Sequence, residues 1–79
     1  MNAQSTEQLQ NIFRAVFELP DSSDVTSLRR DNMERWDSLA HVSLVVGIES
    51  EFGLSIDAGD QLSMTSYEAT QRLLEERGL

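Results

Sequence analysis

The sequence predicts a single all-α domain with three main helices and one short helix, and with a long loop between the first and second helices. Apolar residues recur at helical spacing in several segments, whereas no segment supports a strand. The chain has 79 residues, which is the size of one small domain. Because no composition break or internal repeat divides it, we expect this domain to cover residues 1–79.

The first helix is predicted at about residues 5–18. Ser5 and Gln8 have the spacing of a capping box, in which the serine bonds forward and the glutamine reaches back. The apolar residues that follow have the spacing of an amphipathic helix and are Leu9, Ile12, Phe13, Val16 and Phe17. Pro20 ends this helix, because the residue before a proline disfavours helical dihedrals.

Residues 19–36 are predicted to form an ordered loop rather than a linker. The segment is polar, rich in turn-forming residues and without a clear period. A loop of this length in a compact domain usually has a function or contains an unrecognised element, and one helical turn within it fits the sequence. Four apolar residues are spaced so that they can fix the loop to the core, with Trp36 as its anchor: Val25, Leu28, Met33 and Trp36.

The second helix is predicted to begin at Ser38 and to end at Gly53, a natural C-cap. Asp37 and Ser38 are both good N-cap residues, and the Asp37 carboxylate suits the positive end of the helix dipole. Residues 57–62 then fit one short helix.

The last helix is predicted to open with a capping box formed by Thr65 and Glu68, and to end near residues 77–78. Its apolar residues are Tyr67, Ala69, Leu73 and Leu74. Basic residues towards its C-terminus suit the helix dipole.

The second helix carries two apolar stripes when its residues are placed about 100° apart. The stripe expected to face the core comprises Leu44, Val45, Ile48 and Phe52. The second stripe comprises Leu39, Val42 and Val46. Helical geometry leaves two interpretations of this second stripe open. It packs under the long loop, covered by Met33 or Trp36, or it is a docking face beside Ser38.

The segment from Trp36 to Ile56 resembles the acyl carrier proteins. Its matching features are Asp-Ser-Leu at residues 37–39, the apolar helix that follows, and Glu-x-Glu-Phe-Gly at residues 49–53. Length, acidity and the order of helices extend the resemblance over nearly the whole chain. The resemblance implies a small four-helix bundle of the acyl-carrier type.

The resemblance also implies a covalent cofactor, 4′-phosphopantetheine, on Ser38. A phosphopantetheinyl transferase would add it from coenzyme A with magnesium, through a phosphodiester, so that the product is a phosphoprotein. The arm's thiol would then hold an acyl group as a thioester. The chain has no cysteine, so the arm would carry the only thiol. A plain N-cap role is the alternative interpretation of Ser38.

Partner enzymes that load and process the acyl group are expected to have basic docking surfaces, because the net charge of the chain is −8. The residues expected to contact them are Asp37, Leu39, Val42, Val46 and Glu49. Glu49 is included because it lies at the edge of the second stripe. The same charge argues against nucleic acid as a partner.

We expect a cytoplasmic monomer. The longest run without charged residues, Ser38 to Ile48, is too short to span a bilayer, which needs roughly 20 residues. The first residues lack the basic and apolar regions of a signal peptide.

An enzyme is the function that the sequence supports least. With one histidine, no cysteine and no paired-carboxylate pocket, we predict neither catalytic residues nor a metal site. His41 is interpreted as an ordinary exposed helix residue. Two alternative functions remain: an unmodified helical adaptor that binds a basic partner, and a peptidyl or aminoacyl carrier protein of a nonribosomal pathway.

Several positions depart from the carriers of primary fatty-acid synthesis. Arg35 and Trp36 stand where Gly-Ala usually precedes Asp-Ser-Leu, and Ala40, Ser43 and Ser50 stand where acidic residues are usual. A secondary pathway that loads a polyketide unit, an aminoacyl group or another small acid is therefore as well supported as primary fatty-acid synthesis.

Overall fold

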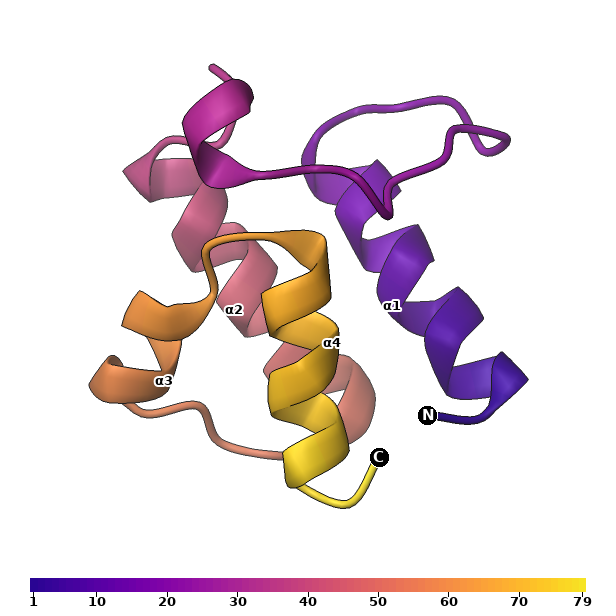
Figure 1. The fold of residues 1–79 in the computed structure, drawn as a ribbon, viewed down its shortest axis with the longest axis vertical. Coiled ribbons are helices and arrows are strands. Elements are labelled where there is room, and N and C mark those ends of the chain that lie inside the picture. The colour runs from indigo at the N-terminus through magenta and orange to yellow at the C-terminus, as the bar shows by residue number, and fades with distance from the viewer.

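The computed structural model describes all 79 residues and is entirely helical apart from loops (Figure 1). Its elements are α1 (Ala3–Val16), the 3-10 turn η1 (Arg30–Asn32), α2 (Ser38–Phe52), α3 (Ala58–Ser63) and α4 (Tyr67–Glu76). The predicted fold of three main helices, one short helix and a long loop is confirmed, and η1 is the single turn expected within the loop. None of the helices has both the length and the apolar character needed to cross a membrane.

The long loop passes over one end of the bundle, from the end of α1 to the start of α2, and both chain termini lie towards the other end (Figure 1). An isolated bridge between Arg29 and Ser66 fastens the middle of this loop to the segment before α4. Its two hydrogen bonds run from the Arg30 N–H to the Thr65 carbonyl and from the Tyr67 N–H to the Leu28 carbonyl, each 2.9 Å long. The loop is therefore ordered, as the sequence indicated.

An aromatic cluster joins α1, the loop and α4 at the centre of the core. The Phe13 ring lies 5.6 Å from the Trp36 ring and 5.2 Å from the Tyr67 ring, measured between centroids, with edge-to-face geometry in both pairs. Phe17 lies 5.3 Å from Trp36. Trp36 is buried and anchors the loop, as predicted, while Leu28 and Met33 pack half-buried against the core.

Helix α1 begins two residues earlier than predicted, because Asn2 is its N-cap. The Asn2 side chain accepts a hydrogen bond from the Ser5 N–H at 2.7 Å. The predicted capping box of Ser5 and Gln8 is therefore wrong, and the Gln8 amide instead donates to Glu51 of α2 at 3.0 Å. The helix also ends earlier, at Val16, because Glu18 adopts a left-handed backbone with φ 55°.

Helix α4 begins at Tyr67, with Ser66 rather than Thr65 as its N-cap. The Ser66 hydroxyl accepts a hydrogen bond from the Ala69 N–H at 3.0 Å. The Thr65 carbonyl is held by the bridge to the loop, and this pairing sets the first helical residue. The predicted capping box of Thr65 and Glu68 is thus wrong by one residue.

Helix α2 has the predicted bounds and the predicted core face. It begins at Ser38, and Gly53 ends it in the left-handed conformation with φ 64°. The core stripe is buried at Leu44, Val45 and Ile48 and half-buried at Phe52. Helix α1 packs closely on this helix, because a Cβ added at Gly47 would lie 3.2 Å from Ile12 Cγ2.

Candidate functional site

Ser38 is the first residue of α2 and is exposed to solvent. The preceding residue, Asp37, is the N-cap, and its carboxylate accepts a hydrogen bond from the Ala40 N–H at 2.9 Å. The interpretation of Ser38 as a plain N-cap is therefore wrong, because Asp37 fills that position. The Ser38 hydroxyl is left accessible at the point where the loop enters the helix.

The backbone around Ser38 favours an attached phosphate. The first N–H groups of a helix have no acceptor within the helix, and in α2 the Asp37 carboxylate accepts one of them, the Ala40 N–H. The His41 N–H makes the first regular helical bond, to the Asp37 carbonyl at 2.9 Å. The N–H groups of Ser38 and Leu39 remain available, at the positive end of the helix dipole. A phosphodiester on Ser38 fits this environment.

The second apolar stripe of α2 is exposed. The exposed fractions are 77% for Leu39, 56% for Val42 and 57% for Val46. The interpretation in which the long loop covers this stripe is therefore wrong, because Trp36 turns inward onto Phe13 and Phe17. The stripe begins one residue after Ser38 and continues for two turns along the helix.

Helix α3 adds an exposed apolar residue that the sequence analysis did not single out. Leu62 has 78% of its surface exposed, and α3 has no buried residue at all. The helix is instead bracketed by two buried residues, Ile56 before it and Met64 after it. A six-residue helix gives too short a pattern to show which of its faces is buried.

Glu49 has a structural contact that the sequence did not reveal. It is half-buried, and its Oε2 accepts a hydrogen bond from the Ile56 N–H at 2.8 Å. This bond fixes the connection between α2 and α3. Partner recognition by Glu49 stays a prediction beside this observed role.

His41 is buried, so its interpretation as an exposed helix residue is wrong. Only 7% of its surface is exposed, and both ring nitrogens have partners. Nδ1 lies 2.9 Å from the Trp36 indole Nε1, and Nε2 lies 2.9 Å from the Gln61 carbonyl oxygen. The sequence did carry a signal for this position, because Leu44, Val45 and Ile48 follow His41 at i+3, i+4 and i+7 and place it on the core stripe.

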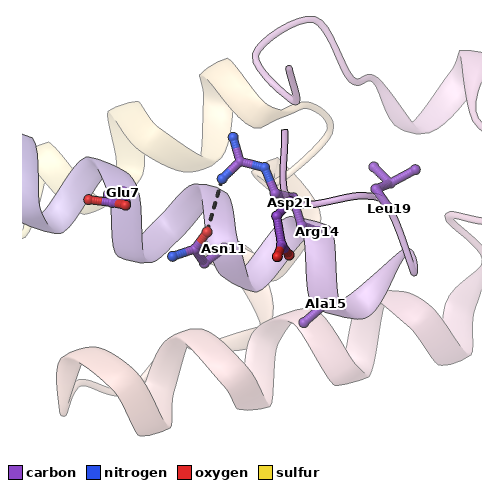
Figure 2. Close-up of a pocket in the computed structure, with 6 residues that line it drawn as sticks. All are labelled: Glu7, Asn11, Arg14, Ala15, Leu19 and Asp21. Carbon is purple, nitrogen blue, oxygen red and sulfur yellow. Dashed lines mark hydrogen bonds between the residues drawn. The ribbon is translucent and has the colours of Figure 1, made fainter. Parts of the chain in front are cut away.

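The largest hollow of the surface lies along α1 and the start of the long loop and has a volume of 440 Å³. Figure 2 shows the residues that line it: Glu7, Asn11, Arg14, Ala15, Leu19 and Asp21. Arg14 donates to the Asn11 side chain and to the Ser23 carbonyl, each at 2.9 Å, and so ties the loop to α1. Since no residue of α2 lines this hollow, it is separate from the Ser38 site.

Two curated relatives are similar to this chain over most of its length. They are acyl carrier protein 4 and acyl carrier protein 1 of Cuphea lanceolata, both described as chloroplastic. Each is 32% identical over 65 residues, which cover 82% of this chain and 47% and 46% of the respective relatives. The chain thus spans about half the length of the curated relatives it matches. These matches confirm the resemblance to the acyl carrier protein family drawn from the segment between Trp36 and Ile56.

No family model matches the chain, and no solved structure matches it.

Proposed function

We propose that this chain is an acyl carrier whose Ser38 hydroxyl becomes esterified with 4′-phosphopantetheine. The observation that carries the proposal is the position of Ser38, exposed at the first residue of α2, with Asp37 as the cap and an apolar stripe beginning at the next residue. In the loading step a bond forms between Ser38 Oγ and the phosphorus that bears the pantetheine, while the pyrophosphate bond of coenzyme A breaks and adenosine 3′,5′-bisphosphate leaves. The hydroxyl proton passes to a base on the transferase.

After loading, the chain itself holds the acyl group on its arm and presents it to partner enzymes. A thioester on the arm's thiol is brought to successive enzymes at the raised effective concentration that a tether provides. No group of the chain is assigned a catalytic role. Both relatives are named acyl carrier proteins, which supports an acyl cargo over the aminoacyl or peptidyl alternative.

Partner enzymes are proposed to dock on the second stripe of α2, formed by Leu39, Val42 and Val46. An exposed apolar stripe beside the loading site suits a short-lived protein contact. Asp37 and Glu49 flank this stripe on the same helix and add negative charge. In a chain with a net charge of −8, these carboxylates favour partners with basic surfaces.

Loading is tested by intact mass after incubation with coenzyme A, magnesium and a promiscuous phosphopantetheinyl transferase. The mass should rise by one phosphopantetheine group. Ser38→Ala should abolish the increase, whereas Ser43→Ala and Ser50→Ala should keep it, because both remove an exposed serine from the same helix. An unchanged wild-type mass would favour the unmodified adaptor. An increase that persists in Ser38→Ala would place the arm elsewhere.

The pathway is proposed separately from the carrier role. Arg35 and Trp36 before the motif, and Ala40 and Ser43 after it, favour a dedicated secondary pathway. A complementation experiment tests this proposal in a cell that lacks its carrier for primary fatty-acid synthesis. We expect no rescue of growth, and rescue would assign the chain to primary fatty-acid synthesis.

A further inference from the structure

A chain of two hydrogen bonds crosses the buried side of α2 three residues after Ser38. The Trp36 indole lies 2.9 Å from His41 Nδ1, and the Gln61 carbonyl lies 2.9 Å from His41 Nε2. An indole N–H only donates and a carbonyl only accepts. His41 must therefore accept at Nδ1 and donate at Nε2, which defines one state of the ring: neutral, with its proton on Nε2.

This chain joins three segments that are distant in sequence. Trp36 belongs to the end of the long loop, two residues before Ser38, and His41 belongs to the first turn of α2. Gln61 belongs to α3, which lies beside the N-terminal half of α2 (Figure 1). The His41 and Trp36 rings lie side by side, with 6.2 Å between centroids and 28° between planes, as an in-plane bond between their nitrogens requires. The His41 imidazole thus links α3 to the end of the loop that precedes Ser38.

The contacts that the residues of α3 themselves make are few and mostly polar, although the buried side chains of Ile56 and Met64 flank the helix. The helix buries none of its own residues. Besides the bond from His41, it is held by an ion pair between Asp60 and Arg77, the residue that caps the end of α4, and by a 3.1 Å bond from the Gln61 side-chain amide to the Ile56 carbonyl. Trp36, in contrast, is fixed by the Phe13 and Phe17 rings. If the His41 ring becomes protonated, we therefore expect α3 to move and Trp36 to stay in place.

We propose that Trp36, His41 and Gln61 form a proton-sensitive latch that holds α3 against the first turn of α2. A proton taken up from water at Nδ1 removes the lone pair that accepts the Trp36 N–H, so that two donors then face each other. A protonated ring left buried without an acceptor at Nδ1 is unfavourable. The ring therefore turns towards water, the Gln61 carbonyl loses its donor, and α3 loosens.

The charged groups on the segments that meet at His41 do not replace the lost partner. At the end of the loop they are Glu34, Arg35 and Asp37, and at α3 they are Asp57 and Asp60. On the neighbouring α4 they are Glu68, Arg72, Glu75 and Glu76, with Arg77 just after it. Arg35 donates to the Phe17 carbonyl, Asp37 and Asp57 cap helices, and Asp60 pairs with Arg77. Phe13 of α1 and Phe17 just after it pack against Trp36 and carry no charge. None of these carboxylates is hydrogen-bonded to His41, so the protonated ring has no built-in counter-ion.

The chain contains one tryptophan and one histidine, so NMR reports on both partners without ambiguity. The unmodified protein is titrated downwards from pH 8 while His41 ring, Trp36 indole and backbone amide signals are followed. At pH 8 the ring nitrogens should show the Nε2–H form. As the ring takes up its proton, the indole N–H should lose its hydrogen-bonded shift, and hydrogen-exchange protection in α3 should fall roughly two- to tenfold, the effect of one hydrogen bond. Protection in α1 should stay constant.

Two results would overturn the latch: a protonated ring with α3 protection and the indole signal unchanged, or a ring that takes up its proton only as all helices unfold together. Trp36→Phe is the matched variant, because it keeps an aromatic ring and removes the donor. Its α3 protection should no longer fall with His41 protonation, and a fall equal to that of the wild type would also reject the proposal. These experiments use neither coenzyme A nor a transferase, so their outcome is independent of the loading test.

Discussion

Ser38 and Asp37 have separate roles although they are adjacent and both suit a helix start. The sequence left the capping role open between them, because cap preference alone ranks them nearly equally. The backbone decides the matter: Asp37 is extended with ψ −175°, and its carboxylate reaches the Ala40 N–H. Ser38 is the first residue of the helix, and its exposed hydroxyl has no part in the cap.

Substitution of Asp37 and of Ser38 should therefore have different effects on stability and loading. Asp37→Ala should lower the free energy of unfolding by about 1 kcal/mol, because it removes the N-cap of α2. Ser38→Ala should change it by less than about 0.5 kcal/mol, as for other surface substitutions, while abolishing loading. Urea unfolding followed by circular dichroism measures both values. A larger loss in Ser38→Ala than in Asp37→Ala would reverse the assignment of the cap.

Tyr67 shows how the core changes the chemistry of a single side chain. The residue is 2% exposed, and burial raises the pKa of its phenol above the usual value of 10.0, against the smaller opposing effects of the Gln10 hydrogen bond and the Arg14 charge. Because the pKa is higher in the folded chain than in the unfolded chain, the corresponding stability is fully present below about pH 10 and is lost as the pH rises through the folded pKa.

The absorbance of the phenolate measures this effect directly, since the chain has a single tyrosine. The folded protein should titrate at higher pH than the protein in concentrated urea, and its melting temperature should fall above pH 10. Tyr67→Phe is the control, because this variant has no phenol to titrate and its melting temperature should lack the corresponding decrease above pH 10. Coincident titration of folded and urea-unfolded protein would show that the Tyr67 hydroxyl is not desolvated.

At the scale of helices, the sequence predicted which elements exist better than where they begin. Amphipathic spacing identified α1 and α2, and the core face of α2 was correct. The starts of α1 and α4 were wrong because neighbouring residues competed as caps, and tertiary contacts such as the bridge at Ser66 decided between them. His41 was predicted to be exposed although its spacing places it on the core stripe, because a polar residue is buried only with hydrogen-bond partners, and the spacing of one helix does not reveal partners such as Trp36 and Gln61.

The two faces of α2 should respond differently to truncation. Ile48 is fully buried, so Ile48→Ala should cost about 2–5 kcal/mol of stability. Val46 is 57% exposed, so Val46→Ala should change stability by less than about 0.5 kcal/mol and instead slow loading. Melting temperature and transferase rate are measured for both variants. If Val46→Ala destabilises as much as Ile48→Ala, the division of the helix into a core face and a docking face is wrong.

At the scale of the whole molecule, charge and apolar surface act on different stages of a partner encounter. The net charge of −8 attracts a basic surface from a distance and speeds association. The exposed stripe of α2 acts only after contact and governs how long the complex lasts. The composition alone indicated the first effect, whereas the second required the structure, because it depends on Trp36 turning away from Leu39, Val42 and Val46.

Glu49 permits a test of the electrostatic stage without loss of its structural contact. In Glu49→Gln the side chain keeps an oxygen that can accept the Ile56 N–H, while the negative charge is lost. Association with the transferase, followed by stopped flow, should slow a few-fold at low salt. It should match the wild type near 0.5 M salt, where exposed charges are screened beyond about 4 Å. Dissociation should be unchanged. Glu7→Gln makes the same charge change on an exposed residue of α1. If both variants slow association equally, the net charge of the whole chain steers the partner and Glu49 has no special part in docking.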